Sequence, residues 1–523
     1  MCSEGQQSSY SLDGSLPIEL ICWIFSYLGC NELVVCRQLC RKLKQIIDTT
    51  AGLQYTIQLY LSGMADNPAH SLSTADKLAL LKRYHDQWYS LPAHLERVVL
   101  FERIRNGYHT QTRDIQGTVG IGPTPEGHFY FAQLPSRIRE IPLKSWVLQL
   151  SEHTGFFTFD PQQDLLVILK RASIPEERPC LRLLELSTGR DHPLAACPSI
   201  PLPHELDNLD LVPAWRIKGE FFCAEDEEVA FFGIWNWRTG SSTRLYESVA
   251  SSAWLGSTCL LLATFGDTAL SGEGFDPPEL ILIDLSRGVA RLQCWRFRLP
   301  IVLAKICRTT FYYTIECEPA VESPAAGLSD PPFCTAEEDS LVVMEASDYP
   351  FRLFFVTSTL VKLVKKMSSP PGGSAIVPWS EWGPGNTHVD DEGGNHAWLA
   401  VYGTRYMTYR KATSELVVYD FNTRRVQHKM RALDNSEGEQ DDPTRIHAYS
   451  RTYWRALAEA AKATDEEMAE LCLDAAEGES QGGPVFMETS SQHGLMPHGF
   501  SKDAIYRLRR HEPKYHAYDA YTL

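Results

Sequence analysis

The sequence lacks the patterns that most metal and catalytic sites require. Its 14 cysteines and 16 histidines form no Cys-x-x-Cys pair and no cluster with zinc-ligand spacing. A phosphate-binding P-loop, a His-Glu-x-x-His helix and a Gly-x-Ser-x-Gly elbow are also missing. The sequence therefore predicts no catalytic residue, no metal and no cofactor.

Neither a long apolar run nor an excess of positive charge occurs. No apolar run approaches the roughly 18 residues that a membrane-spanning helix needs. The 49 Lys and Arg residues are outnumbered by 66 Asp and Glu residues, which gives a net charge of −17. Residues 1–11 are polar and lack the apolar core of a signal peptide. We therefore expect no nucleic-acid or membrane partner, and a location in the cytoplasm, the nucleus or both.

Residues 16–28 form the most apolar stretch near the N-terminus. Pro17 suits the first position of a helix, and from Ile18 to Leu28 only Glu19 and Ser26 are clearly polar. Apolar side chains cover two sides of this helix: Ile18, Ile21, Phe25 and Leu28 on one, and Leu20, Trp23, Ile24 and Tyr27 on the other. A helix that is apolar all round must be buried all round, so a following domain or a partner protein must cover it.

A second helical run follows the break at residues 29–31. Asn31 is a good N-cap residue, and Glu32 suits the first turn. Apolar residues then recur at steps of three and four: Leu33, Cys36, Leu39, Cys40, Leu43, Ile46 and Ile47. We expect one amphipathic helix over residues 31–47, with Cys36 and Cys40 on its buried side.

Together these two runs resemble the F-box. The matching pieces are Leu16-Pro17, Glu19-Leu20, residues 24–28, Leu33, residues 36–37 and residues 39–43, with Leu43 where many F-boxes carry Trp. The resemblance implies binding to the Skp adaptor of a cullin–RING ubiquitin ligase. The implied adaptor-binding residues are Leu16, Pro17, Ile18, Leu20, Ile21, Ile24, Phe25, Leu28, Leu33, Cys36 and Cys40. The alternative is a plain helical hairpin that packs on the rest of the chain.

From about residue 113 short apolar runs alternate with Gly, Pro, Asp and Ser turns, which is typical of all-β domains. An apolar run that ends in a Gly turn recurs about every 50 residues, at Gly189, Gly240 and Gly288, and residues 417–423 look like a later copy. We therefore expect a multidomain α + β protein in which helices precede a β-propeller of about seven irregular blades. A less regular all-β domain is the alternative.

Several phrases of this region also resemble a large fungal family of F-box proteins with a β-rich C-terminal region. They are Leu134-Pro135-Ser136-Arg137, Ile141-Pro142-Leu143, residues 377–384 and Val418-Tyr419-Asp420-Phe421. This resemblance covers residues 12–425 and implies an architecture but no defined substrate.

The expected domains follow the chain in order. Residues 1–11 are a flexible arm, 12–50 an F-box, 51–112 a helical linker and 113–428 a propeller-like substrate-binding domain. Residues 429–523 are expected to hold an acidic loop, a helix over 453–476 and a poorly ordered tail. The alternative for residues 477–523 is a short strand that docks on the β domain.

These patterns favour a non-catalytic substrate receptor of an SCF-type (Skp–cullin–F-box) ubiquitin ligase. It would bind a Skp-type adaptor, cullin through that adaptor, and an unknown protein substrate. The alternatives are an F-box scaffold outside any ligase and a propeller enzyme with scattered catalytic residues.

No substrate-binding residue can be identified from the sequence. The acidic run at residues 225–228 is a solvated loop or a docking patch, and Trp379 and Trp382 are core anchors or an exposed recognition loop. A phosphate-reading site would need several arginines that converge in space, which linear order does not show.

Overall fold

The structure is a computed structural model. It describes residues 16–425 apart from short segments, and five C-terminal ranges: 444–448, 485–492, 499–501, 504–512 and 515–522. The segments left out before residue 425 are 91–95, 106–110, 116, 136–140, 151–153, 172–177, 203–213, 227–230, 246–248, 265–278, 301, 304–312, 318–330, 337–339, 347–350, 368–373, 391–395, 411–414 and 423. The expected arm (1–11), acidic loop and helix over 453–476 lie outside the described residues.

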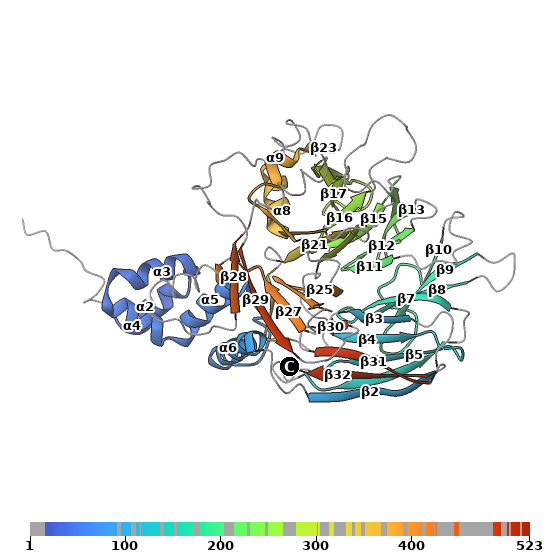
Figure 1. The fold of residues 1–523 in the computed structure, drawn as a ribbon, viewed down its shortest axis with the longest axis horizontal. Helices are drawn as coiled ribbons and strands as arrows, with labels where there is room; N and C mark the ends of the chain where they lie inside the picture. The colour runs from blue at the N-terminus through green and yellow to red at the C-terminus, as the bar shows by residue number, and fades with distance from the viewer. Residues whose placement is uncertain are drawn as a thin grey trace, which may run out of the picture.

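The chain begins with the N-terminal helices, α2 (Ile18–Phe25), α3 (Cys30–Leu39), α4 (Arg41–Thr49) and α5 (Ala51–Ser62), followed by α6 (Thr74–Ser90). Figure 1 shows α2 to α5 projecting from one side of a much larger β-rich part. The N-terminal helices enclose their own core of buried apolar side chains: Ile21, Phe25, Cys30, Leu33, Ile46, Ile47, Leu53 and Ile57.

The expected single helix over residues 31–47 is wrong, because the chain leaves helical geometry at Cys40. The backbone there is extended (φ −156°, ψ 161°), and the Cys40 Sγ atom accepts a hydrogen bond from the Leu43 N–H to cap α4. Gly29, rather than Asn31, precedes the first turn of α3. Since α4 restarts in a new helical phase, Ile46 and Ile47 reach the core while Leu39 is left exposed.

The described strands form seven sheets of four or five strands and one two-stranded pair. The first three sheets are β3 (Gln111–Ile115), β4 (Thr118–Gly122), β5 (His128–Gln133), β6 (Lys144–Gln149); β7 (Thr154–Asp160), β8 (Leu165–Lys170), β9 (Cys180–Glu185), β10 (Ser199–Pro201); and β11 (Ala214–Lys218), β12 (Phe221–Asp226), β13 (Phe231–Asn236), β14 (Ser242–Leu245). The next three are β15 (Val249–Leu255), β16 (Cys259–Thr264), β17 (Glu279–Asp284), β18 (Gln293–Arg298), β23 (Ser374–Val377); β19 (Tyr313–Cys317), β21 (Leu341–Ala346), β22 (Phe351–Val356), β24 (Thr387–Asp390); and β25 (His396–Tyr402), β26 (Arg405–Arg410), β27 (Glu415–Asp420), β29 (Val485–Gln492), β28 (Thr444–Ala448). The seventh is β30 (Gly499–Ser501), β31 (Ala504–Glu512), β32 (Tyr515–Thr522) and β2 (Glu96–Arg105).

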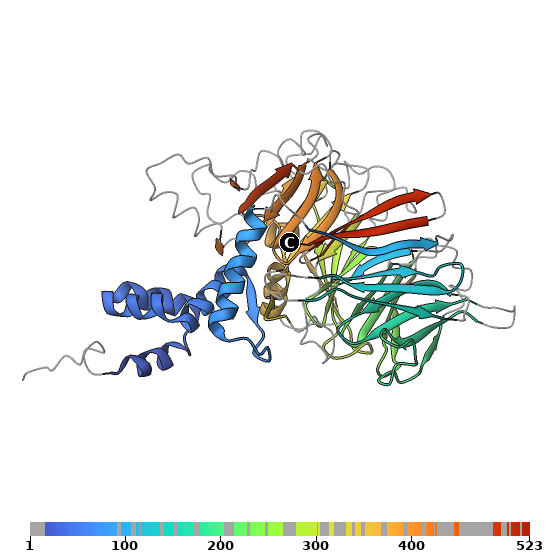
Figure 2. The ribbon, with the colours of Figure 1, turned by 90° about the horizontal axis from the view of Figure 1, so that it is seen from below.

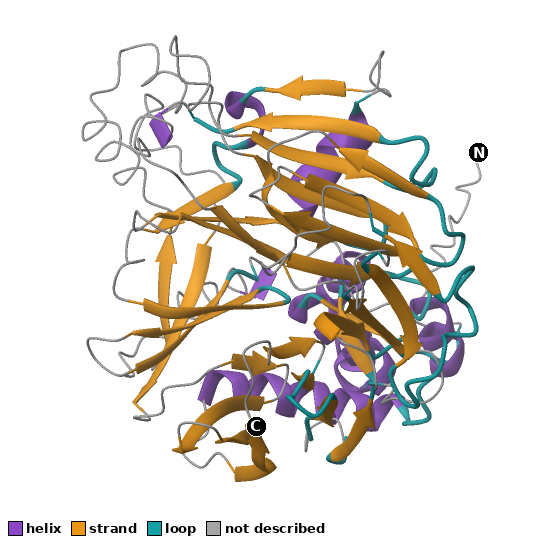
Figure 3. Ribbon diagram, turned by 90° about the vertical axis from the view of Figure 1, so that its right-hand side faces the viewer, coloured by secondary structure: helices purple, strands orange, loops and turns teal. Residues whose placement is uncertain are grey.

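The first strand of each sheet contacts the first strand of the next. The order of contact is β3, β7, β11, β15, β19, β25 and β30, and β30 in turn contacts β3. Seven sheets whose inner strands form a closed ring are the architecture of a β-propeller. Their strands pair antiparallel, except that β23 joins β18 in parallel. Figure 3 shows these sheets, with helices both in the lower part of the view and at its top. The expected fold class, N-terminal helices followed by a β-propeller, is confirmed.

The seventh sheet is built from both ends of the chain. Strand β2, which precedes the first sheet, pairs antiparallel with β32, and β32 pairs with β31. Strands of the seven sheets thus lie beyond both expected boundaries: β2 precedes residue 112, and β28 to β32 follow residue 428. The strands after residue 477 agree with the alternative that this tail docks on the β domain. Their number could not be predicted, because β31 and β32 mix apolar residues with Arg, His and Asp.

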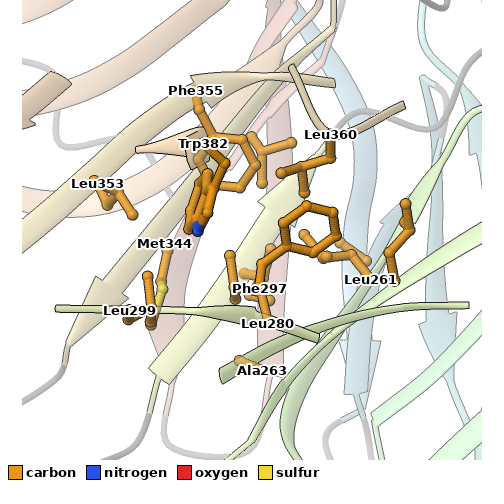
Figure 4. Close-up of a cluster of buried hydrophobic side chains, with 14 of the residues drawn as sticks. Leu261, Ala263, Leu280, Phe297, Leu299, Met344, Leu353, Phe355, Leu360 and Trp382 are labelled. Atoms are coloured by element: carbon orange, nitrogen blue, oxygen red, sulfur yellow. The ribbon is translucent and has the colours of Figure 1, made fainter. Parts of the chain in front are cut away.

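Large apolar clusters fill the space between neighbouring sheets. In Figure 4, Phe297, Met344 and Phe355 from two sheets meet Trp382 of the short helix α9 (Trp379–Trp382), beside α8 (Thr357–Lys366). Trp379 and Trp382 are fully buried, so they are core anchors and not an exposed recognition loop. Glu225 is also buried, within β12, which contradicts its interpretation as part of a solvated loop.

Substitution of Ala520 by Pro tests the closure of the ring. Ala520 lies on β32 between Val98 of β2 and Tyr506 of β31, and Pro would remove a backbone donor from this central strand. We expect the free energy of unfolding to fall by about 1–3 kcal/mol for each backbone group left without a partner, measured by urea denaturation. The control Ala520→Ser keeps the N–H and should change the stability little; equal losses in both variants would contradict the pairing.

Candidate functional site

Helix α2 leaves one apolar side uncovered. Ile21 and Phe25 point into the core, whereas Leu20 is 45% exposed, Trp23 61%, Ile24 42% and Tyr27 74%. These four exposed residues recur at helical spacing, so they share one side of the helix. The rings of Trp23 and Tyr27 contact each other edge to face, with centroids 5.4 Å apart.

Helix α3 adds further exposed apolar side chains. Eight large apolar residues on these two helices are exposed, and we call them the apolar face: Ile18, Leu20, Trp23, Ile24, Tyr27, Val34, Val35 and Leu39. In the rest of the described chain only Leu143, Val147, Leu194 and Ile376 are comparably exposed. Exposed apolar side chains concentrated in so short a segment indicate a protein-interaction surface.

The structure divides the predicted adaptor-binding residues into three groups. Pro17, Ile18, Leu20 and Ile24 are exposed, and Leu16, Leu28, Cys36 and Cys40 are half-buried. Ile21, Phe25 and Leu33 are buried in the helical core, so the expectation that they contact a partner directly is wrong. Their role is to hold the two helices together beneath the apolar face.

Sequence reasoning left five residues of the apolar face out of the predicted site. Trp23 and Tyr27 could have been included from the helical spacing of α2 alone. Val34, Val35 and Leu39 on α3 could not, because the assumption of one continuous helix through Cys40 gave Leu39 the wrong environment.

The apolar face is held in a fixed relation to the propeller by a junction. Figure 2 shows α6 running along the sheets, with α2 to α5 beyond it. Between α5 and α6 the chain forms β1 (Met64–Asp66), which pairs antiparallel with β20 (Phe333–Thr335) of the propeller. Apolar side chains from both parts pack in this junction: Tyr55, Leu80, Leu81, Tyr84, Phe333, Met407 and Val418.

Polar contacts reinforce the pairing of β1 with β20. The buried Lys77 Nζ donates to Asp66 Oδ1 at 2.9 Å and to the Asn67 carbonyl at 2.6 Å, and the Tyr55 hydroxyl donates to the same carboxylate at 2.8 Å. Burial, followed by the hydrogen bond to Asp66, raises the pKa of Tyr55. Asn67 Nδ2 reaches across to the Pro331 carbonyl at 2.9 Å, so the polar network also spans the two parts.

A buried charged group completes the junction. Arg405 of β26 lies 3.1 Å from His85 Nδ1 on α6 and 3.4 Å from Asp420 Oδ2. Burial, and then the positive charges of Arg425 and Arg405, hold the pKa of His85 well below its usual range. His85 is therefore neutral, and its Nδ1 accepts the hydrogen bond from Arg405.

The described residues contain neither a metal-ligand cluster nor a membrane-spanning helix. No group of three or more His, Cys, Asp or Glu side chains there is arranged to hold a metal ion. None of the described helices is both long and apolar enough to span a bilayer.

Comparison with known proteins identifies the N-terminal segment. A family model described as F-box-like matches residues 13–53, so these residues form an F-box-like domain, as the sequence predicted. No curated protein matches the chain. The likeness of residues 12–425 to a fungal family stays a prediction.

Solved structures with a similar shape are distant in sequence. Hsv2 from Kluyveromyces lactis is 7% identical, with 62% of this chain and 93% of that chain covered and a TM-score of 0.29. The β-propeller domain of Cps50 (Swd1) from Myceliophteria thermophila is 10% identical, with 52% of this chain and 66% of that chain covered and a TM-score of 0.28. U3-55K is 9% identical, with 63% of this chain and 82% of that chain covered and a TM-score of 0.31. The propeller assignment rests on the ring of inner strands and not on these matches.

The neutral state of His85 predicts a pH-dependent stability. Below pH 6.5 the unfolded chain protonates this histidine while the folded chain does not, so stability is lost as the pH falls. Between pH 7.5 and 5.5 the loss from this residue approaches about 1.4 kcal/mol. His85→Gln keeps an acceptor for Arg405 but does not titrate, so thermal unfolding of this variant should depend less on pH than that of the wild type. Unfolding of His85→Gln that depends on pH as strongly as that of the wild type would contradict the prediction.

Proposed function

We propose that this chain is a substrate receptor of an SCF-type ubiquitin ligase, and that its apolar face binds a Skp-type adaptor. One observation carries the proposal: the F-box-like domain completes its own core and still leaves eight large apolar side chains exposed. Full burial of a large apolar side chain contributes roughly 1.5–3 kcal/mol, so a partner that covers several of them gains substantial affinity. Trp23 and Tyr27 are of the types that most often dominate binding energy in interfaces.

In this proposal the adaptor contacts are the accessible predicted residues together with five more. The first set is Leu16, Pro17, Ile18, Leu20, Ile24, Leu28, Cys36 and Cys40, and the second is Trp23, Tyr27, Val34, Val35 and Leu39. The propeller binds a protein substrate, and the junction keeps that substrate at a constant position relative to the adaptor. The chain itself forms and breaks no covalent bond; its contribution is to raise the local concentration of substrate beside the ubiquitin carrier. The proposal includes a cytoplasmic or nuclear location.

Paired alanine substitutions in the full chain test adaptor binding. Leu20→Ala with Ile24→Ala removes two exposed aliphatic side chains from the apolar face, and each should cost roughly 2 kcal/mol of affinity for the adaptor. The matched control, Leu143→Ala with Val147→Ala, removes two exposed aliphatic side chains from the first propeller sheet. In co-purification with a Skp-type adaptor we expect recovery with the wild type and the control, and loss with the first pair. Undiminished recovery with the first pair would contradict the proposal.

The same purification separates a ligase subunit from a scaffold outside any ligase. Both would retain the adaptor through the apolar face, but only the ligase subunit would also retain cullin. Cullin recovered with the wild type and lost with the first alanine pair supports the ligase assignment. Adaptor recovered repeatedly without cullin would overturn it in favour of the scaffold.

A further inference from the structure

Two arginines from different sheets meet near the centre of the ring. Arg113 and Arg216 are each the middle residue of a five-residue inner strand, β3 and β11, so they lie at the same level of the ring. Strand β7 separates β3 from β11, yet the charge of Arg216 lowers the pKa of Arg113, after the larger effect of burial. Arg216 also reaches Glu316 on β19, although β15 lies between β11 and β19, so its side chain extends into the ring.

Arg113 has no carboxylate partner in the described part of the chain. Its one hydrogen bond is to a neutral amide: Nη2 donates to Gln111 Oε1 at 3.3 Å. Its Nε–H is buried and has no acceptor among the described residues. A guanidinium that is removed from water without a counter-charge is costly, and a bound anion would remove that cost.

Arg216 is close to two carboxyl groups but is only loosely paired with the first. Its Nη2 lies 3.5 Å from Glu316 Oε1 on β19, which is long for a charge-assisted hydrogen bond, and its buried Nε–H has no acceptor among the described residues. Burial lowers the pKa of Arg216, but the charges of Glu316 and Glu225 together raise it above its usual value. Glu225 is the other carboxyl near Arg216; burial raises its pKa, although Arg216 acts in the opposite direction. The Arg216 and Glu316 side chains remain 27% and 39% exposed, so solutes reach this part of the ring.

We propose that the ring centre binds an oxyanion, a carboxylate or a phosphate group, between Arg113 and Arg216. Each planar guanidinium can present two parallel N–H donors to the oxygens of such a group, and the unpaired Nε–H of each arginine is one of them. The site is independent of the apolar face and stands whether or not the chain joins a ligase. It is formed by the propeller alone, and its ligand is either a free anion or the acidic or phosphorylated side chain of a peptide.

The negative charge of Glu316 leads to a second prediction about anion binding. Its carboxylate competes with the anion for Arg216 and adds negative charge to the site. Removal of that charge should strengthen anion binding, whereas removal of the Arg113 charge should weaken it.

The test measures binding of three probes to the purified full chain by isothermal titration calorimetry at constant ionic strength. The probes are inorganic phosphate and the tripeptides Gly-phosphoserine-Gly and Gly-Glu-Gly. Three variants are compared with the wild type: Arg113→Gln, Glu316→Gln and the control Arg291→Gln, which removes an exposed charge from a turn. We expect Arg113→Gln to weaken binding about tenfold or more, Glu316→Gln to strengthen it, and Arg291→Gln to leave it unchanged.

The probes also distinguish the sources of the ligand. Tighter binding of either tripeptide than of inorganic phosphate supports a peptide ligand, and the reverse order supports a free anion. No binding of any probe to the wild type, or equal binding to the wild type and Arg113→Gln, would overturn the proposal. Thermal unfolding without any anion adds a control for folding: an arginine without a counter-charge predicts that Arg113→Gln is no less stable than the wild type, and a clear loss of stability would assign Arg113 a structural role instead.

Discussion

The pairing of β2 with β32 is the interaction on which the rest of the molecule depends. It joins the first strand of the β-rich part to the last, so that one sheet holds both ends of the ring together. Because β2 follows α6 closely in sequence, the same pairing also fixes where the helices leave the propeller. The junction around Lys77, Asp66 and Arg405 then sets their direction. The pairing of β2 therefore contributes both to the closure of the ring and to the orientation of the apolar face.

The two proposed binding surfaces have opposite chemistry because they are built from different kinds of element. The apolar face lies on short helices whose core is already complete, so its side chains are available to a partner without any rearrangement. At the ring centre, inner strands from separate sheets carry charged side chains that interact across sheets, as Arg216 does with Glu316. The two surfaces can bind their partners independently, since one lies on the N-terminal helices and the other at the centre of the propeller.

Sequence reasoning succeeded where the signal was local. The apolar stretch over Ile18–Phe25, the succession of helices and sheets, and the core role of Trp379 all follow from patterns within a few residues. It failed where the outcome depends on distant parts of the chain. The break at Cys40 is stabilised by the core that α5 completes, β32 is a strand because β2 and β31 flank it, and the approach of Arg113 to Arg216 exists only in the closed ring.

The union of β1 with β20 is made by main-chain groups, which are the same whatever side chains the two strands carry. Replacement of Ala65 or Cys334 therefore leaves the pairing itself in place, whereas Asp66 and Phe333 also contribute side chains to the junction. The exposed surfaces of the helices and of the propeller can accordingly evolve separately while the orientation of one part relative to the other is inherited.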